Sequence, residues 1–240
     1  MTFGTFQAGQ ALGWLVPVLQ ISLIDLLLGG DNALVIAMAC RGLPPRIWRR
    51  VVWLGTGAAV VLRIGLTALA ALILNLPLLK LIGAALLVAI AVKLLAEEPP
   101  SWATLNDAQQ EQDVRRVFVT ILVADTVMSL DNVLAVAAAA RGSFWLLSFG
   151  LALSIPIVIF GSVAVARALE RFPVLILAGG ALLGWVAGET AVSDPAIRDW
   201  IANQAPWLAT AAAPATAVYC LAHGRLERLR RARSASRPVR

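Results

Sequence analysis

Residues 25–42 read DLLLGGDNALVIAMACRG, and residues 125–142 read DTVMSLDNVLAVAAAARG. Each stretch places two carboxylates inside an otherwise apolar run. Five residue types recur with an offset of 100 residues, so that Asp25, Asp31, Asn32, Arg41 and Gly42 return as Asp125, Asp131, Asn132, Arg141 and Gly142. This doubled pattern predicts that the chain holds two copies of one structural unit.

The composition indicates a membrane protein. The chain has 240 residues, of which 60% are hydrophobic and only 14% are charged, and its mean hydropathy is +0.81. Apolar runs of about 18 residues or more recur, which is typical of membrane-spanning helices. The runs do not alternate apolar and polar residues as the strands of a membrane β-barrel would.

The apolar runs predict an all-α, polytopic membrane protein with seven transmembrane helices. Tryptophans fall near several span ends, as expected for side chains at the membrane interface. The expected spans are residues 13–39, 51–74, 78–96, 117–140, 145–167, 173–191 and 206–222.

The repeat extends beyond the aspartate segments. Residues 76–93, LPLLKLIGAALLVAIAVK, align with residues 172–189, FPVLILAGGALLGWVAGE, and Gly55 aligns with Gly150 in the weaker middle match. Each half therefore has three spans, and an odd number requires the second half to insert upside down. Inverted repeats with a site at the midplane are an established transporter architecture. The expected plan is an N-terminal repeat (1–96), a polar cytoplasmic linker (97–116), an inverted second repeat (117–191), an outer loop with the seventh span (192–224) and a basic cytoplasmic tail (225–240).

Basic residues predict the orientation. With the N-terminus outside, fifteen Lys and Arg residues fall on the cytoplasmic side and three fall outside, namely Lys80, Arg141 and Arg198. This asymmetry follows the positive-inside rule and places the protein in the plasma (inner) membrane with a cytoplasmic C-terminus. The arginine-rich tail is typical of a stop-transfer flank beside anionic lipid, so we expect no nucleic-acid partner.

The aspartates are the candidate site. An ionised side chain at the bilayer centre costs about 2.5–3.5 kcal/mol, so four of them must face the protein interior and be neutralised. Carboxylate and amide oxygens suit Mn²⁺, Mg²⁺ or Ca²⁺ better than Zn²⁺ or Cu²⁺. The predicted metal ligands are Asp25, Asp31, Asn32, Asp125, Asp131 and Asn132.

Helix geometry suggests how span 1 presents its oxygens. On a straight helix Asp25 and Asn32 share a face, while Asp31 points about 120° away. We expect Gly29-Gly30 to unwind the helix there. Span 4 has Met128-Ser129-Leu130 at that place, which predicts a break less strongly. Ser22 and Ser129 would add hydroxyls, and Met128 is either a soft ligand or a packing residue.

The alternative to a cation is pairing with intramembrane bases. The candidates are Arg63 and Lys93, and two bases cannot neutralise four aspartates together with Glu189. Arg63 lies deep and is a candidate tether for carboxylates when the cation is absent. Lys93 and Glu189 occupy equivalent repeat positions, either as a gate or coupling pair or as end residues whose charges reach the interface.

The paired segments DLLLGGDNALVIA and DTVMSLDNVLAVA resemble the TerC family of integral membrane proteins, and GGDNALVIAMACRGLP is most similar to its YjbE-like branch, related to Alx-type manganese exporters. The resemblance covers about residues 15–192. It implies a fold of inverted three-helix halves and, for several members, manganese export. It maps the family's intramembrane acidic residues onto Asp25, Asp31, Asp125 and Asp131, although many relatives have Glu at the first position.

The leading functional prediction is a secondary transporter that exports Mn²⁺ and is not an enzyme. The sequence has no GxxxxGK[ST] motif for nucleotide binding, and we expect no catalytic residues and no permanently bound cofactor. Two alternatives are a metal-dependent membrane enzyme and a membrane partner that supports metal loading of other proteins. The expected partners are the metal ion and the lipid bilayer, and homo-oligomerisation is left open.

Overall fold

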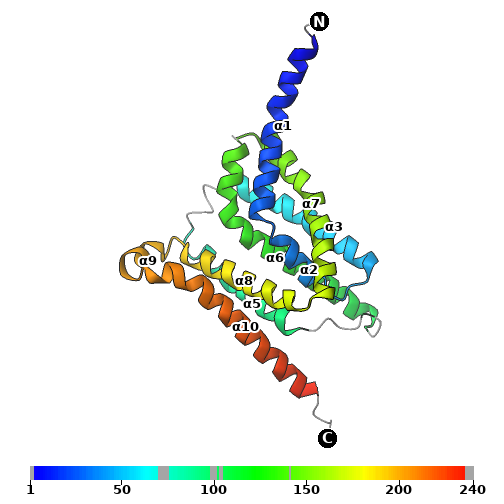
Figure 1. Ribbon diagram of the computed structural model, residues 1–240, viewed down its shortest axis with the longest axis vertical. Helices are drawn as coiled ribbons and strands as arrows, with labels where there is room; N and C mark the ends of the chain where they lie inside the picture. Colours follow the sequence, from blue (N-terminus) through cyan, green and yellow to red (C-terminus); the bar gives the residue numbers. More distant parts are fainter. Residues whose placement is uncertain (1–2, 70–75, 98–101, 103–104, 141, 236–240) are drawn as a thin grey trace.

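The computed structural model of the protein describes residues 3–69, 76–97, 102, 105–140 and 142–235, and throughout these residues every regular element is a helix (Figure 1). The predicted all-α class is therefore confirmed. The helices are α1 (Phe3–Leu28), α2 (Asn32–Ala39), α3 (Pro45–Ala68), α5 (Leu79–Ala96), α6 (Asp107–Ala140), α7 (Phe144–Arg171), α8 (Val174–Val192), α9 (Arg198–Gln204) and α10 (Trp207–Ala235).

Between five and seven candidate membrane spans occur among the described residues, judged by helix length and composition. Helices α3, α5, α6, α7 and α8 are each long and apolar enough to cross a bilayer. Two bent pairs raise the number to seven if each is one span: α1 with α2, bent by 57°, and α9 with α10, bent by 115°. Residues 70–74 of the expected second span, Arg141, and residues 98–101, 103–104 and 236–240 of the linker and tail lie outside the described residues.

Helical structure continues into segments that the sequence analysis assigned to the linker and tail. Helix α6 already begins at Asp107, and α10 continues to Ala235. At the start of α6, the Gln109 N–H donates to the Asn106 side-chain oxygen at 2.9 Å, and the Asn106 N–H donates to the Gln109 side-chain oxygen at 3.0 Å. This reciprocal capping satisfies two amides at the start of the helix. These two helices therefore extend beyond the expected spans 117–140 and 206–222.

The first span of each half packs against the second span of the other half. Helix α1 packs against α7, and α3 packs against α6. A Cβ atom on Gly150 of α7 would collide with Ile21 of α1, and one on Gly55 of α3 would lie 3.3 Å from Ile121 of α6. Ile21 and Ile121 are 100 residues apart, and the two glycines are aligned in the repeat. The same close contact therefore occurs twice.

Helices α5, α8 and α10 lie side by side in a second group (Figure 1). Gly184 and Gly188 of α8 face α10, where a Cβ on Gly188 would lie 2.6 Å from the Ala213 Cα atom. Small residues four apart let helix backbones approach closely, which supports association inside a membrane. Helix α10 is therefore packed tightly on the second half.

A buried aspartate joins the ends of α5 and α8. Asp194 follows α8 and is fully buried, and its carboxylate accepts hydrogen bonds from the backbone N–H groups of Leu78 (3.0 Å), Lys80 (3.0 Å), Leu81 (3.1 Å) and Ala196 (2.8 Å). Burial opposes the ionised form, but the four donors together hold the pKa of Asp194 below its usual range. The sequence analysis did not identify this cap of the α5 N-terminus.

We expect Asp194→Asn to lower the free energy of unfolding by about 1.5–3 kcal/mol at neutral pH, because a charged acceptor of several N–H bonds is lost. The folded pKa is below the unfolded value of about 3.9, so this stability is present above about pH 4 and is lost as the pH falls through the folded pKa. Thermal unfolding in detergent measures it. The exposed Asp199→Asn is the control, and equal melting temperatures for both variants would contradict the prediction.

Candidate functional site

The site begins at a break in the first span. Helix α1 ends at Leu28 and α2 begins at Asn32, as Gly29-Gly30 predicted. A Cβ atom on Gly29 would lie 2.9 Å from the Asp25 carbonyl oxygen and 3.0 Å from the Asn32 side-chain nitrogen. Glycine is therefore required by a close approach at this point. In the second half, α6 is continuous through Asp125 and its neighbours, so the two aspartate segments differ in backbone conformation.

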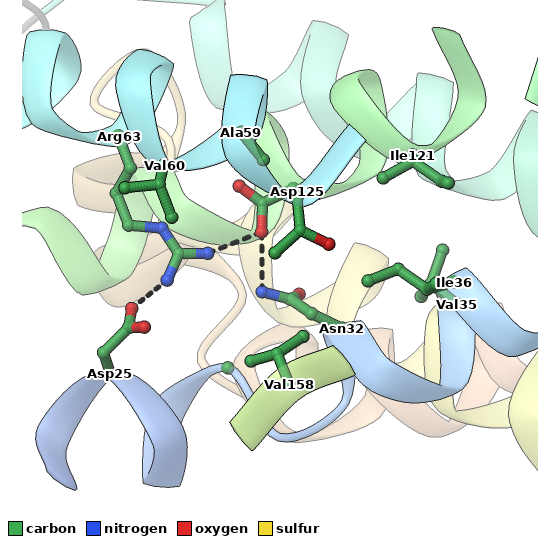
Figure 2. A pocket seen from close by; sticks show the side chains of 12 residues that line it. Asp25, Asn32, Val35, Ile36, Ala59, Val60, Arg63, Ile121, Asp125 and Val158 are labelled. Carbon is green, nitrogen blue, oxygen red and sulfur yellow. Dashed lines mark hydrogen bonds and ion pairs between the residues drawn. The ribbon is translucent and has the colours of Figure 1, made fainter. Parts of the chain in front are cut away.

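One arginine connects the two halves. Arg63 of α3 is 4% exposed, and its guanidinium forms ion pairs with Asp25 of α1 and, at 2.6 Å, with Asp125 of α6. Figure 2 shows the guanidinium lying between the two carboxylates. The sequence analysis named Arg63 as a candidate tether, and this is the contact such a tether requires. One carboxylate from each repeat therefore contacts the same buried guanidinium.

Both asparagines of the doubled motif bond across the halves. The Asn32 side-chain amide donates to Asp125 Oδ1 at 2.7 Å, and the Asn132 amide donates to the Leu28 carbonyl oxygen at 3.2 Å. Ser129 is fully buried and lies 3.4 Å from the other Asp125 oxygen. The Asp125 carboxylate is therefore held by groups from three helices.

A small cavity lies beside these groups. It has a volume of about 20 Å³, and its lining combines apolar residues such as Val60 and Ile121 with five polar side chains: Asp25, Asn32, Thr56, Arg63 and Asp125 (Figure 2). Among the described residues, Asn32 Oδ1 and Thr56 Oγ1 are buried without a hydrogen-bond partner. The volume suits one water-sized particle. The cavity thus has both space and unpaired oxygens, and the sequence analysis did not identify Thr56.

The remaining two aspartates lie in different surroundings. Asp131 is 41% exposed at its side chain and pairs with Lys80 of α5, which also donates to Ser193 Oγ at 3.1 Å. Asp31 Oδ1 is buried and has no hydrogen-bond partner among the described residues. In that part of the chain, no three His, Cys, Asp or Glu side chains are close enough to hold a metal ion together. The structure therefore brings Asp25 and Asp125 together at Arg63, and neither Asp31 nor Asp131 pairs with that guanidinium among the described residues.

Two of the additional candidates have structural roles. Ser22 donates to the Gly150 carbonyl oxygen at 2.6 Å and to the Val18 carbonyl oxygen at 3.0 Å, so it joins α1 to α7 and supplies no hydroxyl to the cavity. Met128 is buried in the apolar core with residues such as Leu87. This supports the packing interpretation of Met128 over the ligand interpretation.

Lys93 and Glu189 do not form a pair. Lys93 is half-buried, and Glu189 is exposed and accepts a hydrogen bond from Trp185 Nε1 at 2.8 Å. No ion pair joins Lys93 to Glu189 in the described part of the chain. Lys80, which the sequence analysis placed on the outer side without a role, is the lysine that contacts an aspartate of the motif. Nothing in the linear pattern signals this contact, because the two residues are 51 positions apart.

In a comparison with known proteins, the chain matches one family. A family model described as "Integral membrane protein TerC family" matches residues 11–232. A relative from Bacillus subtilis (strain 168), described as "Uncharacterized membrane protein YjbE", is 42% identical over 190 residues, which are 79% of this chain and 85% of the relative. No solved structure matches the chain significantly. Both aspartate segments lie within the family match.

We expect Arg63→Gln to lower the free energy of unfolding by about 3–5 kcal/mol, because two buried carboxylates lose their counter-charge. Adding Asp25→Asn should recover part of this loss, since one of the unpaired charges is then removed. Thermal unfolding of the two single variants and the double variant in detergent measures the coupling. The exposed Arg198→Gln serves as the control, and strictly additive losses would contradict the assignment.

Proposed function

The chain belongs to the TerC family of integral membrane proteins, and we propose that it is a secondary transporter that exports a divalent metal cation, with Mn²⁺ as the first candidate. The observation that carries the proposal is the meeting of Asp25 and Asp125, one from each half, at a buried guanidinium beside a small cavity. Ionisable groups at membrane depth mark ion pathways because their burial is costly.

The charge of the site favours a divalent cargo. The four aspartates of the doubled motif carry four negative charges when ionised, and Arg63 and Lys80 supply two positive charges. The six side chains together therefore carry a net charge of minus two, and Asp25, Asp125 and Arg63 among them are buried in the bundle. One divalent cation would neutralise this net charge, whereas a monovalent ion would leave a buried charge uncompensated.

The donor atoms favour a hard cation. The Asp25 and Asp125 carboxylates, Asn32 Oδ1 and Thr56 Oγ1 are all oxygens, and all four side chains line one cavity. Oxygen ligands suit Mn²⁺, Mg²⁺ and Ca²⁺. Within this class we prefer Mn²⁺ because the resemblance described above implies manganese export.

Arg63 and the cargo are alternative counter-charges for the same carboxylates. Asp125 Oδ1 already accepts bonds from Arg63 and from Asn32 Nδ2, so a cation that binds there must displace the guanidinium. The break between α1 and α2 supplies a backbone hinge beside Asp25. When the cargo leaves, Arg63 returns and prevents two bare carboxylates from facing each other. Metal release linked to protonation is a further route, since ligands bind metals only when deprotonated.

We propose that the helices form two inverted three-helix repeats followed by a seventh span. The exchanged packing of Ile21 on Gly150 and of Ile121 on Gly55 supports this arrangement, because a two-fold axis between the halves would interconvert the two contacts. Such repeats allow alternating access to a site at their interface.

The orientation has a direct test. The N-terminus should be outside and the C-terminus cytoplasmic in the inner membrane, because this topology places fifteen of eighteen loop-region Lys and Arg residues inside. Reporter fusions to each end, active on one side of the membrane only, measure it. Two termini on the same side would remove the seven-span arrangement.

Asp25→Asn and Asp125→Asn should each abolish transport without loss of the protein from the membrane, because the cavity then lacks one of its two carboxylates. Asp31→Asn and Asp131→Asn should also impair transport. Protection of exporter-deficient cells from Mn²⁺ measures this, with immunoblotting of membranes for expression. Asp199→Asn, which changes an exposed carboxylate in the first turn of α9, is the matched control. If all four variants protect as well as the parent chain, the transport site lies elsewhere.

A further inference from the structure

The two outer aspartates of the doubled motif occupy equivalent repeat positions but differ chemically. Asp131 forms an ion pair with Lys80, whose side chain is 14% exposed. Asp31 has a buried oxygen without a hydrogen-bond partner among the described residues. In an inverted repeat with identical halves, the two carboxylates would have the same surroundings. Their difference therefore requires a sequence difference between the halves.

The difference lies in the third span of each half. Lys80 is the fifth residue of LPLLKLIG, and the fifth residue of the aligned FPVLILAG is Ile176. The repeat therefore supplies a base to Asp131 and an apolar residue at the corresponding place in the second half. The other base, Arg63, also has an apolar counterpart in the second half. It aligns with Val158 when Gly55 is matched to Gly150. Both bases of the site come from the first half.

The two carboxylates lie at different depths of the bundle. The first-half segment runs antiparallel to α6: Ile36 and Cys40 pack with Ile121, whereas Ile21 packs with Val136 and Ala140. Asp131 is six residues beyond Asp125 in the direction of Ala140, which is about 9 Å along a helix. Asp31 lies nearer the depth of Asp125, because the neighbouring Asn32 bonds Asp125, whereas Asn132, beside Asp131, bonds Leu28. Asp131 is therefore on the Ala140 side, beside a lysine, and Asp31 is on the Ile36 side, without one.

We propose that Lys80 is a tethered counter-cation that competes with the transported cation for Asp131, so that cargo binds weakly at Asp131 and more tightly at Asp31. This inference rests on the proposed function. The ammonium group can occupy Asp131 only when no cation is bound there. No lysine competes at Asp31 among the described residues, and one oxygen of that carboxylate is buried without a hydrogen-bond partner.

This asymmetry sets the affinity of each carboxylate for the cation. The ion gradients across the membrane determine the net direction of transport. A tethered counter-cation that competes for a carboxylate raises the dissociation constant of the transported cation there and so favours its release. In the proposed orientation Asp131 lies on the outward side of Asp125, because its partner Lys80 lies at the start of the third span. Weak binding outside and tight binding inside are what an exporter needs to take up a scarce cytoplasmic ion and to release it.

The plainer role of Lys80 is structural. Lysines near helix ends extend their charge toward water, and the Lys80 backbone N–H already bonds Asp194. That backbone bond survives any side-chain substitution, so a purely structural lysine would change stability and leave cation affinity at Asp131 unaltered. The competition model requires a change in affinity that depends on Asp131.

The test is Mn²⁺ binding to purified full-length protein in detergent, followed by the electron paramagnetic resonance signal of free Mn²⁺. Lys80→Gln should bind Mn²⁺ about five- to tenfold more tightly than the parent chain, the scale of a partly exposed ion pair, and should release it more slowly in vesicle flux. Lys80→Arg, which keeps the charge, should resemble the parent. Lys93→Gln is the matched control, because that lysine is in the same helix and has no contact with a motif aspartate in the described part of the chain.

The outcomes separate this inference from the proposed function. In Lys80→Gln/Asp131→Asn the gain in affinity should disappear. Suppose that the parent chain binds and transports Mn²⁺. If Lys80→Gln then has unchanged affinity, or if the gain in affinity survives in the double variant, the competition model is overturned while the proposed transport function stands. If the parent chain neither binds nor transports a divalent cation, the proposed function fails first. Lys80→Met, which retains the aliphatic stem, replaces Lys80→Gln if the latter is not recovered folded.

Discussion

The ion pairs that Arg63 forms with Asp25 and Asp125 are the constraint around which the helices are arranged. Charges buried in an apolar bundle are stable only when each has a partner of opposite charge and further hydrogen bonds. Asp125 meets this requirement through Asn32 and Ser129, and the approach of Asn32 requires the glycine break before α2. The contact also joins α1, α3 and α6, so the two halves are held together at the site itself.

The sequence predicted the parts of the site that lie close together along the chain. The doubled Asp-Asn motif and the break at Gly29-Gly30 are visible as local patterns, and Arg63 stands out as an isolated base within an apolar span. The contacts of Lys80 with Asp131 and of Asp194 with the start of α5 join residues about 51 and 114 positions apart. No periodicity reports such distances. Ser22 was misassigned for the same reason, because its partner, the Gly150 carbonyl oxygen, belongs to another span.

The ends of the helices are a second feature that the sequence predicts poorly. Residues 107–116 are polar and were assigned to a linker, but they include good helix formers and follow a capping pair, Asn106 and Gln109. Hydropathy reports which residues favour lipid, and it does not report where a helix stops. The repeat itself was easier to find than its asymmetry. Both bases come from the first half, and only the structure shows that Asp31 and Asp131 consequently have different surroundings.

The central claim is that the two halves share one site for a divalent cation. Flux into liposomes that contain the purified protein, measured across a panel of Mn²⁺, Mg²⁺, Ca²⁺, Zn²⁺ and K⁺, tests it most directly. The account predicts saturable flux of a hard divalent cation, led by Mn²⁺, with no flux of K⁺. Flux of every ion at the level of protein-free liposomes, or flux of K⁺ alone, would contradict it.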